Sequence, residues 1–211
     1  MDCKTIIFDL GGVILPLDVQ STIKKILALT GKDVKNWIQF GFPHDIIQKF
    51  ELGKISERTF FEEMKDLLEF DDDIYYLKDA WNSMLLDIPK ENIETLKELS
   101  KQHQLILLSN TCETHIKKFE QMLSDTHEIS HLEELFNQVY FSCRMGLRKP
   151  DEKIFQKIIK DNNIDLHKAI YYDDTLTHIE SAKTIGLNAL LYPQNQLLDC
   201  VLQPITVNSL L

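Results

Sequence analysis

Four short segments of this sequence carry the residue types that are needed to attack, hold and neutralise a phosphate. They are residues 8–13, 108–111, 146–150 and 171–174. Three of them end hydrophobic runs, and the segment 146–150 is a polar stretch before a helical pattern. Together they offer a carboxylate, a hydroxyl, an ammonium group and a pair of carboxylates. This set predicts a phosphoryl-transfer site, provided that the fold brings the segments together.

Asp9 is the first candidate for chemistry. It follows the apolar, β-branched run 5–8 and precedes Gly11 and Gly12. A carboxylate on such an open loop, where backbone N–H groups can point at an anion, can act as a nucleophile and form an aspartyl phosphate. Asp-x-Gly is also common in turns, so Asp9 by itself leaves a simple turn residue as the alternative.

Asp173 and Asp174 are adjacent carboxylates after a second apolar run. They repel each other unless a cation or hydrogen-bond donors compensate. With Asp9 and a backbone carbonyl they would form an all-oxygen site suited to Mg²⁺, which would also reduce repulsion between Asp9 and an incoming phosphate. The alternative is that one of the pair caps the following helix.

Ser109 and Asn110 could offer a hydroxyl and an N–H to a phosphoryl oxygen, although both residues also favour ordinary turns. Lys149 could pair with Asp9 and with the charge that develops in the transition state. Its alternative role is that of a solvated surface lysine. We interpret three further polar residues as surface, structural or rim residues: Arg148, His115 and His178.

Strand-like and helical patterns alternate through most of the chain. Strands are predicted at 5–8, 105–108, 139–141, 169–172 and 189–192, with helices between them, one of which runs from after residue 111 to about Phe136. Such alternation predicts an α/β fold, a doubly wound parallel sheet of the Rossmann-like type covered on both faces. Ligands of these sheets bind beyond the carboxyl ends of the strands, where Asp9, Ser109 and Asp173 would meet.

The segment from about 18 to 86 has a helical period instead. It predicts about four helices and a short connecting helix, inserted after the first strand. We therefore expect a core domain of residues 1–16 and 87–211, and a helical-bundle cap of residues 17–86. Three aromatic or polar residues near a predicted turn of this cap are interpreted as cap core rather than substrate contacts: Trp37, Phe42 and His44.

Composition limits the possible functions. The chain has 211 residues, 44% of them hydrophobic, and a net charge of −10, which argues against binding to a nucleic acid. An anionic substrate would have to be held by local positive groups or a metal. The apolar residues of the tail 194–211, including Leu197, Leu198, Val201 and Leu202, could belong to the core or to a dimer contact, so a monomer and a homodimer both stay open.

Cellular location is predicted from the thiols and from the apolar runs. Cys3, Cys112, Cys143 and Cys200 form no Cys-x-x-Cys pair, which favours free thiols in a reducing compartment. The first residues lead directly into a strand, so no signal peptide is expected, and no apolar run reaches the roughly 18 residues of a membrane helix. We expect a cytoplasmic protein without a membrane partner.

The four segments, in this order, resemble the motifs of the haloacid dehalogenase (HAD) superfamily of aspartate-nucleophile hydrolases, in the branch with a helical cap after the first strand. The resemblance spans roughly residues 4–192 and is greatest to bacterial phosphatases of the sugar-1-phosphate type, including those of α-D-glucose 1-phosphate. It implies a Mg²⁺-dependent phosphatase of small phosphorylated metabolites, with sugar phosphates as the expected class.

The resemblance also implies roles for individual residues. Asp9 would be the nucleophile and a metal ligand, and Gly11 would offer its backbone carbonyl to the metal. Asp174 would bind Mg²⁺ directly, and Asp173 would bind it directly or through water. Ser109 and Asn110 would hold the phosphoryl group, and Lys149 would neutralise it.

Gly11 departs from the pattern of most phosphatases in the superfamily. They carry at this position a second Asp that serves as general acid and base, a contribution of about 10² to 10⁴ in rate. Phosphatases of the sugar-1-phosphate type also have Gly here. The enzyme could prefer easy leaving groups such as an anomeric phosphate, could use another proton donor, or could bind phosphoesters with little turnover.

Three alternatives follow from these observations. A dehalogenase acting on carbon–halogen bonds needs no metal, and the Asp173–Asp174 pair argues against it. A phosphomutase would need a proton shuttle that Gly11 does not supply. A phosphometabolite-binding protein would explain Gly11, but binding alone does not require the nucleophile Asp9.

Overall fold

The computed structural model describes residues 3–40 and 45–198, and its centre is a parallel sheet of five strands in the order β3-β2-β1-β4-β5. The central strand pairs with both neighbours in parallel, so that Phe8 lies opposite Leu107 on one side and Tyr172 on the other. The predicted doubly wound α/β fold is therefore confirmed. The strands are β1 Thr5–Phe8, β2 Gln104–Ser109, β3 Gln138–Phe141, β4 Ala169–Asp173 and β5 Asn188–Leu191.

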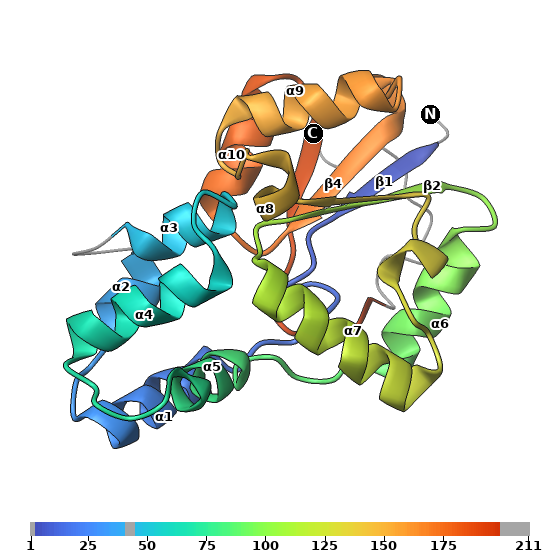
Figure 1. Ribbon diagram of the computed structural model, residues 1–211. Helices are drawn as coiled ribbons and strands as arrows, with labels where there is room; N and C mark the ends of the chain where they lie inside the picture. Colours follow the sequence, from blue (N-terminus) through green and yellow to red (C-terminus); the bar gives the residue numbers. More distant parts are fainter. Residues whose placement is uncertain (1–2, 41–44, 199–211) are drawn as a thin grey trace.

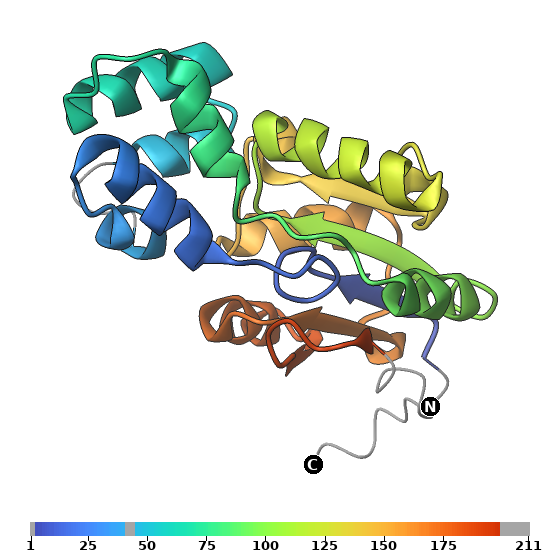
Figure 2. The ribbon, with the colours of Figure 1, turned by 90° about the horizontal axis from the view of Figure 1, so that it is seen from below.

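Helices cover both faces of the sheet (Figures 1 and 2). One face packs against α6 (Lys90–Leu99) and α7 (Glu113–His127), and the other against α9 (Glu152–Asp161) and α10 (Leu176–Thr184). Ile6 and Phe8 belong to the first hydrophobic cluster, whereas Ile7 belongs to the second. Burial on both faces explains why β1 is a continuous apolar run rather than an alternating one.

Five helices follow β1 and form a separate body beside the sheet (Figures 1 and 2). Ser56 caps α4, since its hydroxyl accepts a hydrogen bond from the N–H of Thr59, and Gly31 ends α1 with φ 71°. We propose that residues 17–86, which enclose these helices, form the cap. The helices are α1 Val19–Thr30, α2 Lys35–Phe40, α3 Ile46–Glu51, α4 Glu57–Leu68 and α5 Ile74–Asn82.

Two stretches differ from the predicted elements. The helical region expected to reach about Phe136 ends at His127, because Glu128 adopts a left-handed conformation, and a 3₁₀ turn, η1 Leu132–Glu134, follows. A short helix, α8 Ser142–Met145, was not predicted, since four residues are too few for a periodic pattern. A second 3₁₀ turn, η2 Leu166–Lys168, precedes β4.

The structure also tests the predictions for Trp37, for the apolar tail, for the cysteines and for membrane helices. Trp37 is partly buried against the hydrophobic core, as interpreted, and Leu198 is fully buried while Leu197 is exposed. Cys3, Cys112 and Cys143 form no disulfide within the part of the chain that the structure describes. Among the described residues, none of the helices combines the length and apolar character needed to cross a bilayer. Outside the described residues lie Phe42, His44, Cys200, Val201 and Leu202.

Candidate active site

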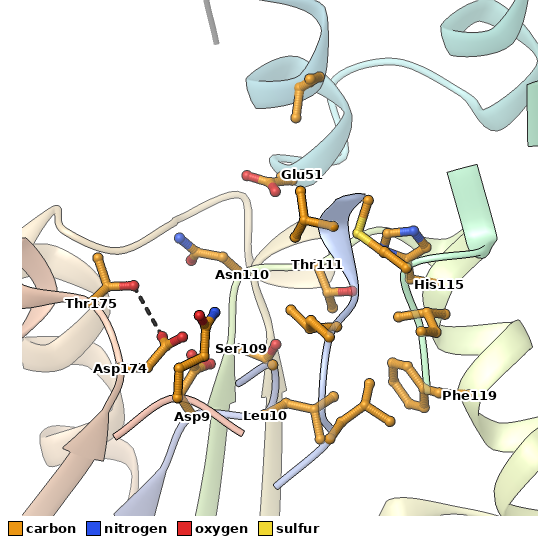
Figure 3. A pocket seen from close by; sticks show the side chains of 18 of the residues that line it. Asp9, Leu10, Glu51, Ser109, Asn110, Thr111, His115, Phe119, Asp174 and Thr175 are labelled. Carbon is orange, nitrogen blue, oxygen red and sulfur yellow. Dashed lines mark hydrogen bonds between the residues drawn. The ribbon is translucent and has the colours of Figure 1, made fainter. Parts of the chain in front are cut away.

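The predicted functional segments meet at the carboxyl ends of the central strands, facing the cap (Figure 3). Asp9 directly follows β1, Ser109 is the last residue of β2, and Asp173 is the last residue of β4. The backbone N–H of Asp9 donates to the carbonyl of Tyr172 at 2.9 Å, which extends the strand pairing up to the carboxylate. Residues up to 165 positions apart in the sequence (9 and 174) thus share one site.

Lys149 lies at the centre of this site. Its Nζ is 2.8 Å from Oδ1 of Asp9 and 2.7 Å from Oδ2 of Asp173, and it donates to the carbonyl of Leu108 at 2.9 Å. The side chain is fully buried, so the alternative of a solvated surface lysine is wrong. Burial acts to lower the pKa of Lys149, but the two carboxylates outweigh it and raise that pKa. A permanent positive charge therefore faces Asp9.

Asn110 fixes the backbone of Lys149 with both ends of its side-chain amide. Oδ1 accepts from the N–H of Lys149 and Nδ2 donates to its carbonyl, each at 2.9 Å. The sequence suggested a contact of Asn110 with the phosphate. The side-chain amide holds the lysine loop, and the contact of an Asn110 N–H with a phosphoryl oxygen stays a prediction.

Asp173 accepts hydrogen bonds from several directions. The N–H of Thr175 donates to Oδ1 at 2.7 Å, the Nδ1–H of His178 lies 3.0 Å from both oxygens, and the hydroxyl of Tyr171 donates to Oδ2. Burial acts against the charged form, but Lys149 and His178 outweigh it and hold the pKa of Asp173 well below its usual range. Tyr171 was seen in the sequence only as part of the strand, and His178 only as a structural or rim residue.

Asp174 lies beside this cluster and contacts the loop after β1. Its Oδ1 accepts from the hydroxyl of Thr175 at 3.1 Å, and its Oδ2 lies where a Cβ on Gly12 would be, within 2.2 Å. Burial, and then the charge of Asp173, raise the pKa of Asp174. The loop and the carboxylate are therefore packed as closely as a glycine allows.

The carboxylates fit a divalent cation. One oxygen each of Asp9, Asp173 and Asp174 lies within 4.8 Å of the others. Burial raises the pKa of Asp9 to about 7 against the pull of Lys149, and the neighbouring carboxylates Asp173 and Asp174 add to that rise. Excess negative charge on hard oxygen donors is what Mg²⁺ neutralises.

A cavity of about 810 Å³ opens above these groups, between the core and the cap. Asp9, Asn110 and Asp174 line one side of it, and Leu10, His115 and Phe119 line the other (Figure 3). A cavity of this size can enclose a small metabolite. The cluster at the strand ends thus faces a space that is large enough for a substrate.

Contacts from the cap reach the rim of this cavity. Glu51 of α3 accepts from Arg148 at 2.7 Å, so Arg148 is structural as interpreted. His115 of α7 stacks on Trp81 of α5 with ring centroids 5.3 Å apart, and its Nε2 lies 3.3 Å from the Trp81 carbonyl. Burial, opposed by that carbonyl, lowers the pKa of His115 to about 4, so its ring is neutral at neutral pH.

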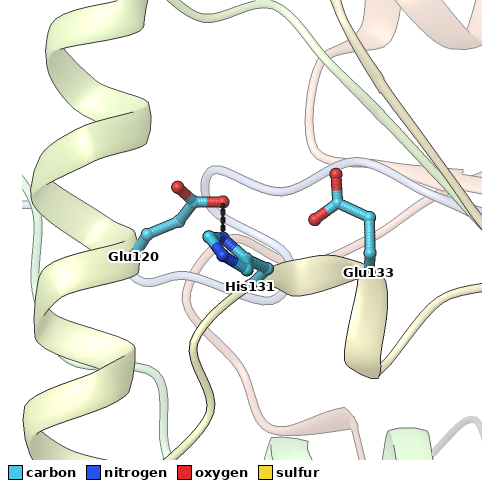
Figure 4. Close-up of side chains that lie close together, drawn as sticks. All are labelled: Glu120, His131 and Glu133. Atoms are coloured by element: carbon cyan, nitrogen blue, oxygen red, sulfur yellow. Dashed lines mark hydrogen bonds and ion pairs between the residues drawn. The ribbon is translucent and has the colours of Figure 1, made fainter.

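A second group of metal-ligand residue types lies elsewhere, between the middle of α7 and η1 (Figure 4). Nδ1 of His131 lies 3.3 Å from Oε1 of Glu120, and Glu133 is close by. His131 and Glu133 are exposed. We assign this group no role beyond the surface ion pair, since exposed acidic residues often cluster without a ligand.

Comparison with known proteins gives the class of this chain. The family model of haloacid dehalogenase-like hydrolases matches residues 3–186, so the chain belongs to that hydrolase family. It is 26% identical to a D-ribitol-5-phosphate phosphatase of Bacteroides thetaiotaomicron over 192 residues, which cover 91% of this chain and 92% of the relative. It is 21% identical to a sesquiterpene phosphatase of Aspergillus oryzae, over 89% of this chain and 88% of that protein.

Solved structures show the same fold. A HAD family enzyme of Bacteroides thetaiotaomicron, in complex with magnesium and inorganic phosphate, superposes with a TM-score of 0.84 at 24% identity, covering 95% of this chain and 100% of that one. A HAD-like hydrolase of Porphyromonas gingivalis has a TM-score of 0.83 at 25% identity, over 95% and 96% of the two chains. The predicted fold is found in these structures, and the predicted family is confirmed by the match of the family model.

Proposed function

We propose that this chain is a Mg²⁺-dependent phosphatase of small phosphorylated metabolites that works through an aspartyl-phosphate intermediate. The observation that carries this proposal is the buried ammonium group of Lys149, which pairs with Asp9 and Asp173, while Asp9 itself lines an 810 Å³ cavity. A nucleophile beside a permanent cation and a cluster of carboxylates is suited to a phosphate dianion.

In the first step, an oxygen of the Asp9 carboxylate forms a bond to phosphorus, and the bond from phosphorus to the alcohol oxygen breaks. Lys149 balances the charge that builds on the phosphoryl oxygens, and the hydroxyl of Ser109 and the backbone N–H of Asn110 hold them. In the second step, water attacks the aspartyl phosphate, which releases inorganic phosphate and restores the Asp9 carboxylate.

Asp9, the carbonyl of Gly11 and Asp174 are the proposed ligands of Mg²⁺. The bound ion would supply positive charge that screens the phosphate from the carboxylates. Asp173 is the remaining candidate ligand, directly or through water. Because Lys149, Tyr171, Thr175 and His178 already donate to it, we favour the water-mediated role.

The alcohol leaving group must take a proton, and Gly11 has no side chain to provide one. A Cβ at Gly11 would lie 2.9 Å from Cδ1 of Leu17, so the flexible end of an apolar side chain lies beside the position that an acid would take. We infer that the leaving group is either a good one or takes its proton from water.

The substrate class within the phosphate monoesters is the open question. The motifs resemble those of sugar-1-phosphate phosphatases, and the chain is similar to a D-ribitol-5-phosphate phosphatase. Both similarities favour a sugar or polyol phosphate as substrate. The sesquiterpene phosphatase favours an apolar alcohol. A cytoplasmic location and a monomer or homodimer stay predictions.

The decisive experiment is phosphate release from 4-nitrophenyl phosphate and from a hexose 6-phosphate, with and without Mg²⁺, with Asp9→Asn as control. We expect Mg²⁺-dependent release that Asp9→Asn abolishes, with the phenyl ester cleaved faster. Binding of both esters without release would contradict the phosphatase and favour a phosphometabolite-binding protein. Release of halide from a haloacid without Mg²⁺ would favour the dehalogenase.

A further inference from the structure

The cavity above Asp9 has two chemically different sides (Figure 3). The side that faces the strand ends is lined by Asp9, Ser109, Asn110 and Asp174, which the proposed reaction uses. The opposite side is lined by apolar side chains from the loop after β1, from the cap and from α7. They include Leu15, Leu17, Ile23, Trp81, Met84 and Phe119.

We propose that the alcohol part of the substrate is apolar: the site takes phosphate monoesters of an extended aliphatic or aromatic alcohol rather than of a polyol. This inference rests on the proposed phosphatase function and narrows its substrate. The phosphate would lie against Asp9 and Asp174, and the carbon skeleton would extend toward Leu17, Met84 and Phe119.

Three polar side chains on the cap side of the cavity contact other groups of the protein, although the buried Nε of Arg148 has no hydrogen-bond partner among the described residues. Glu51 and Arg148 form an ion pair with 2.7 Å between Oε2 and a guanidinium nitrogen. His115 contacts the Trp81 carbonyl and lies flat on the Trp81 ring. Thr111 adds one hydroxyl. The other two, Gln20 and Lys35, are exposed.

A polyol would bind less favourably in such a space than an apolar alcohol. Each hydroxyl moved from water against an apolar wall without a hydrogen bond costs free energy, whereas each buried methylene contributes. Sites that select a polyhydroxylated ligand present several well-placed donors and acceptors to it. Here Glu51, Arg148 and His115 already contact Arg148, Glu51 and the Trp81 carbonyl, respectively, and the buried Nε of Arg148 is the donor among them that has no partner in the described part of the chain.

The neighbourhood of Gly11 supports the same substrate. Cδ1 of Leu17 would lie 2.9 Å from a Cβ on Gly11, so in the proposed reaction the leaving oxygen departs next to an apolar side chain. A phenol leaves as a fairly stable anion, with a pKa of about 10 for the tyrosine phenol, and needs that acid less than a sugar alcohol does. An aromatic apolar alcohol therefore fits both the wall and the missing acid.

The test uses phenyl phosphate and its 4-ethyl, 4-butyl and 4-hexyl derivatives, in which the leaving group stays nearly constant while the apolar length grows. Their affinity for Asp9→Asn with Mg²⁺ is measured by calorimetry, together with that of ribitol 5-phosphate. We expect a rise of about fourfold per methylene until the cavity is full, equivalent to about 0.8 kcal/mol each. A flat series, or tighter binding of ribitol 5-phosphate, would overturn the proposal.

Two variants of cavity-lining residues then test where the alkyl group of the ligand binds. Met84→Gln is nearly isosteric and should reduce the gain in affinity per methylene. Leu17→Asn, in the loop after β1, should reduce it as well. Met122→Gln is the matched control, since Met122 packs on the core and is not among the cavity-lining residues. A slope that survives in both lining variants means binding elsewhere and overturns the proposal.

The binding series does not depend on turnover, so the two proposals can fail separately. If the wild type releases no phosphate but the slope holds, the phosphatase assignment fails and the apolar ligand class stands. If phosphate is released but affinity does not rise with alkyl length, the phosphatase assignment stands and the apolar ligand class fails.

Discussion

A carboxylate oxygen of Asp174 fills the space where Gly12 would carry a side chain. A Cβ built on Gly12 would lie 2.2 Å from Oδ2 of Asp174, and Gly12 also has a positive φ of 79°. Both the backbone conformation and the close approach therefore require glycine. The loop that carries Asp9 and the loop that carries Asp174 are locked together through this contact.

Gly12→Ala should therefore displace Asp174 and weaken Mg²⁺ binding. We expect at least a tenfold higher Mg²⁺ concentration for half-maximal activity, measured by titration of phosphate release. Gly31→Ala is the matched control, because Gly31 has a similar φ of 71° but nothing within 4 Å of the added Cβ. It should lose about 1 kcal/mol of stability and keep its Mg²⁺ dependence. Equal Mg²⁺ dependence in the two variants would show that Asp174 is not a ligand.

Gly11→Asp should supply the missing proton donor. Gly11 is not among the glycines with positive φ, and its Cβ would meet only the flexible end of Leu17. We expect kcat/KM for a hexose 6-phosphate to rise about tenfold or more, with little change for 4-nitrophenyl phosphate. Gly11→Asn, of the same size but unable to protonate the leaving group, should give no such gain. If the Asn variant gains as much, the effect is not acid catalysis.

Lys149→Met should cost both activity and stability, although methionine has a similar shape. The substitution leaves Asp9 and Asp173 buried without their shared cation, which typically costs about 3 to 5 kcal/mol. Chemical denaturation measures this loss, and the exposed Lys153→Met is the control. Mg²⁺ should raise the melting temperature of Lys149→Met more than that of the wild type, because the ion replaces part of the lost charge. An unchanged free energy of unfolding would contradict the proposed charge balance.

His115 should make folding stability fall in mild acid. Burial lowers its pKa in the folded protein from 6.5 to about 4, so between these values the unfolded chain binds a proton that the folded chain does not. Stability is therefore lost as the pH falls from about 6.5 to 4, by about 1 to 3 kcal/mol for a side chain that is partly exposed. Denaturation across this range should show a smaller loss in His115→Phe. The exposed His167→Gln serves as control.

Much of this protein could be read from local patterns. The run 5–8, the alternation of strands and helices after residue 87 and the helical period of residues 18–86 predicted the elements, because hydrophobic periodicity reflects which face of each element is buried. The rule that ligands lie beyond the carboxyl ends of parallel strands was then enough to gather Asp9, Ser109 and the Asp173–Asp174 pair.

The tertiary structure decided what these residues do to one another. Lys149 is fully buried, Asn110 holds its backbone, and Tyr171 and His178 donate to Asp173. These features depend on contacts between segments that no local pattern connects. The same holds for the apolar wall of the cavity, since Leu17, Met84 and Phe119 come from three distant stretches of chain. A residue's type and spacing set the chemistry that it can offer, whereas its burial, charge environment and partners arise only when the segments pack.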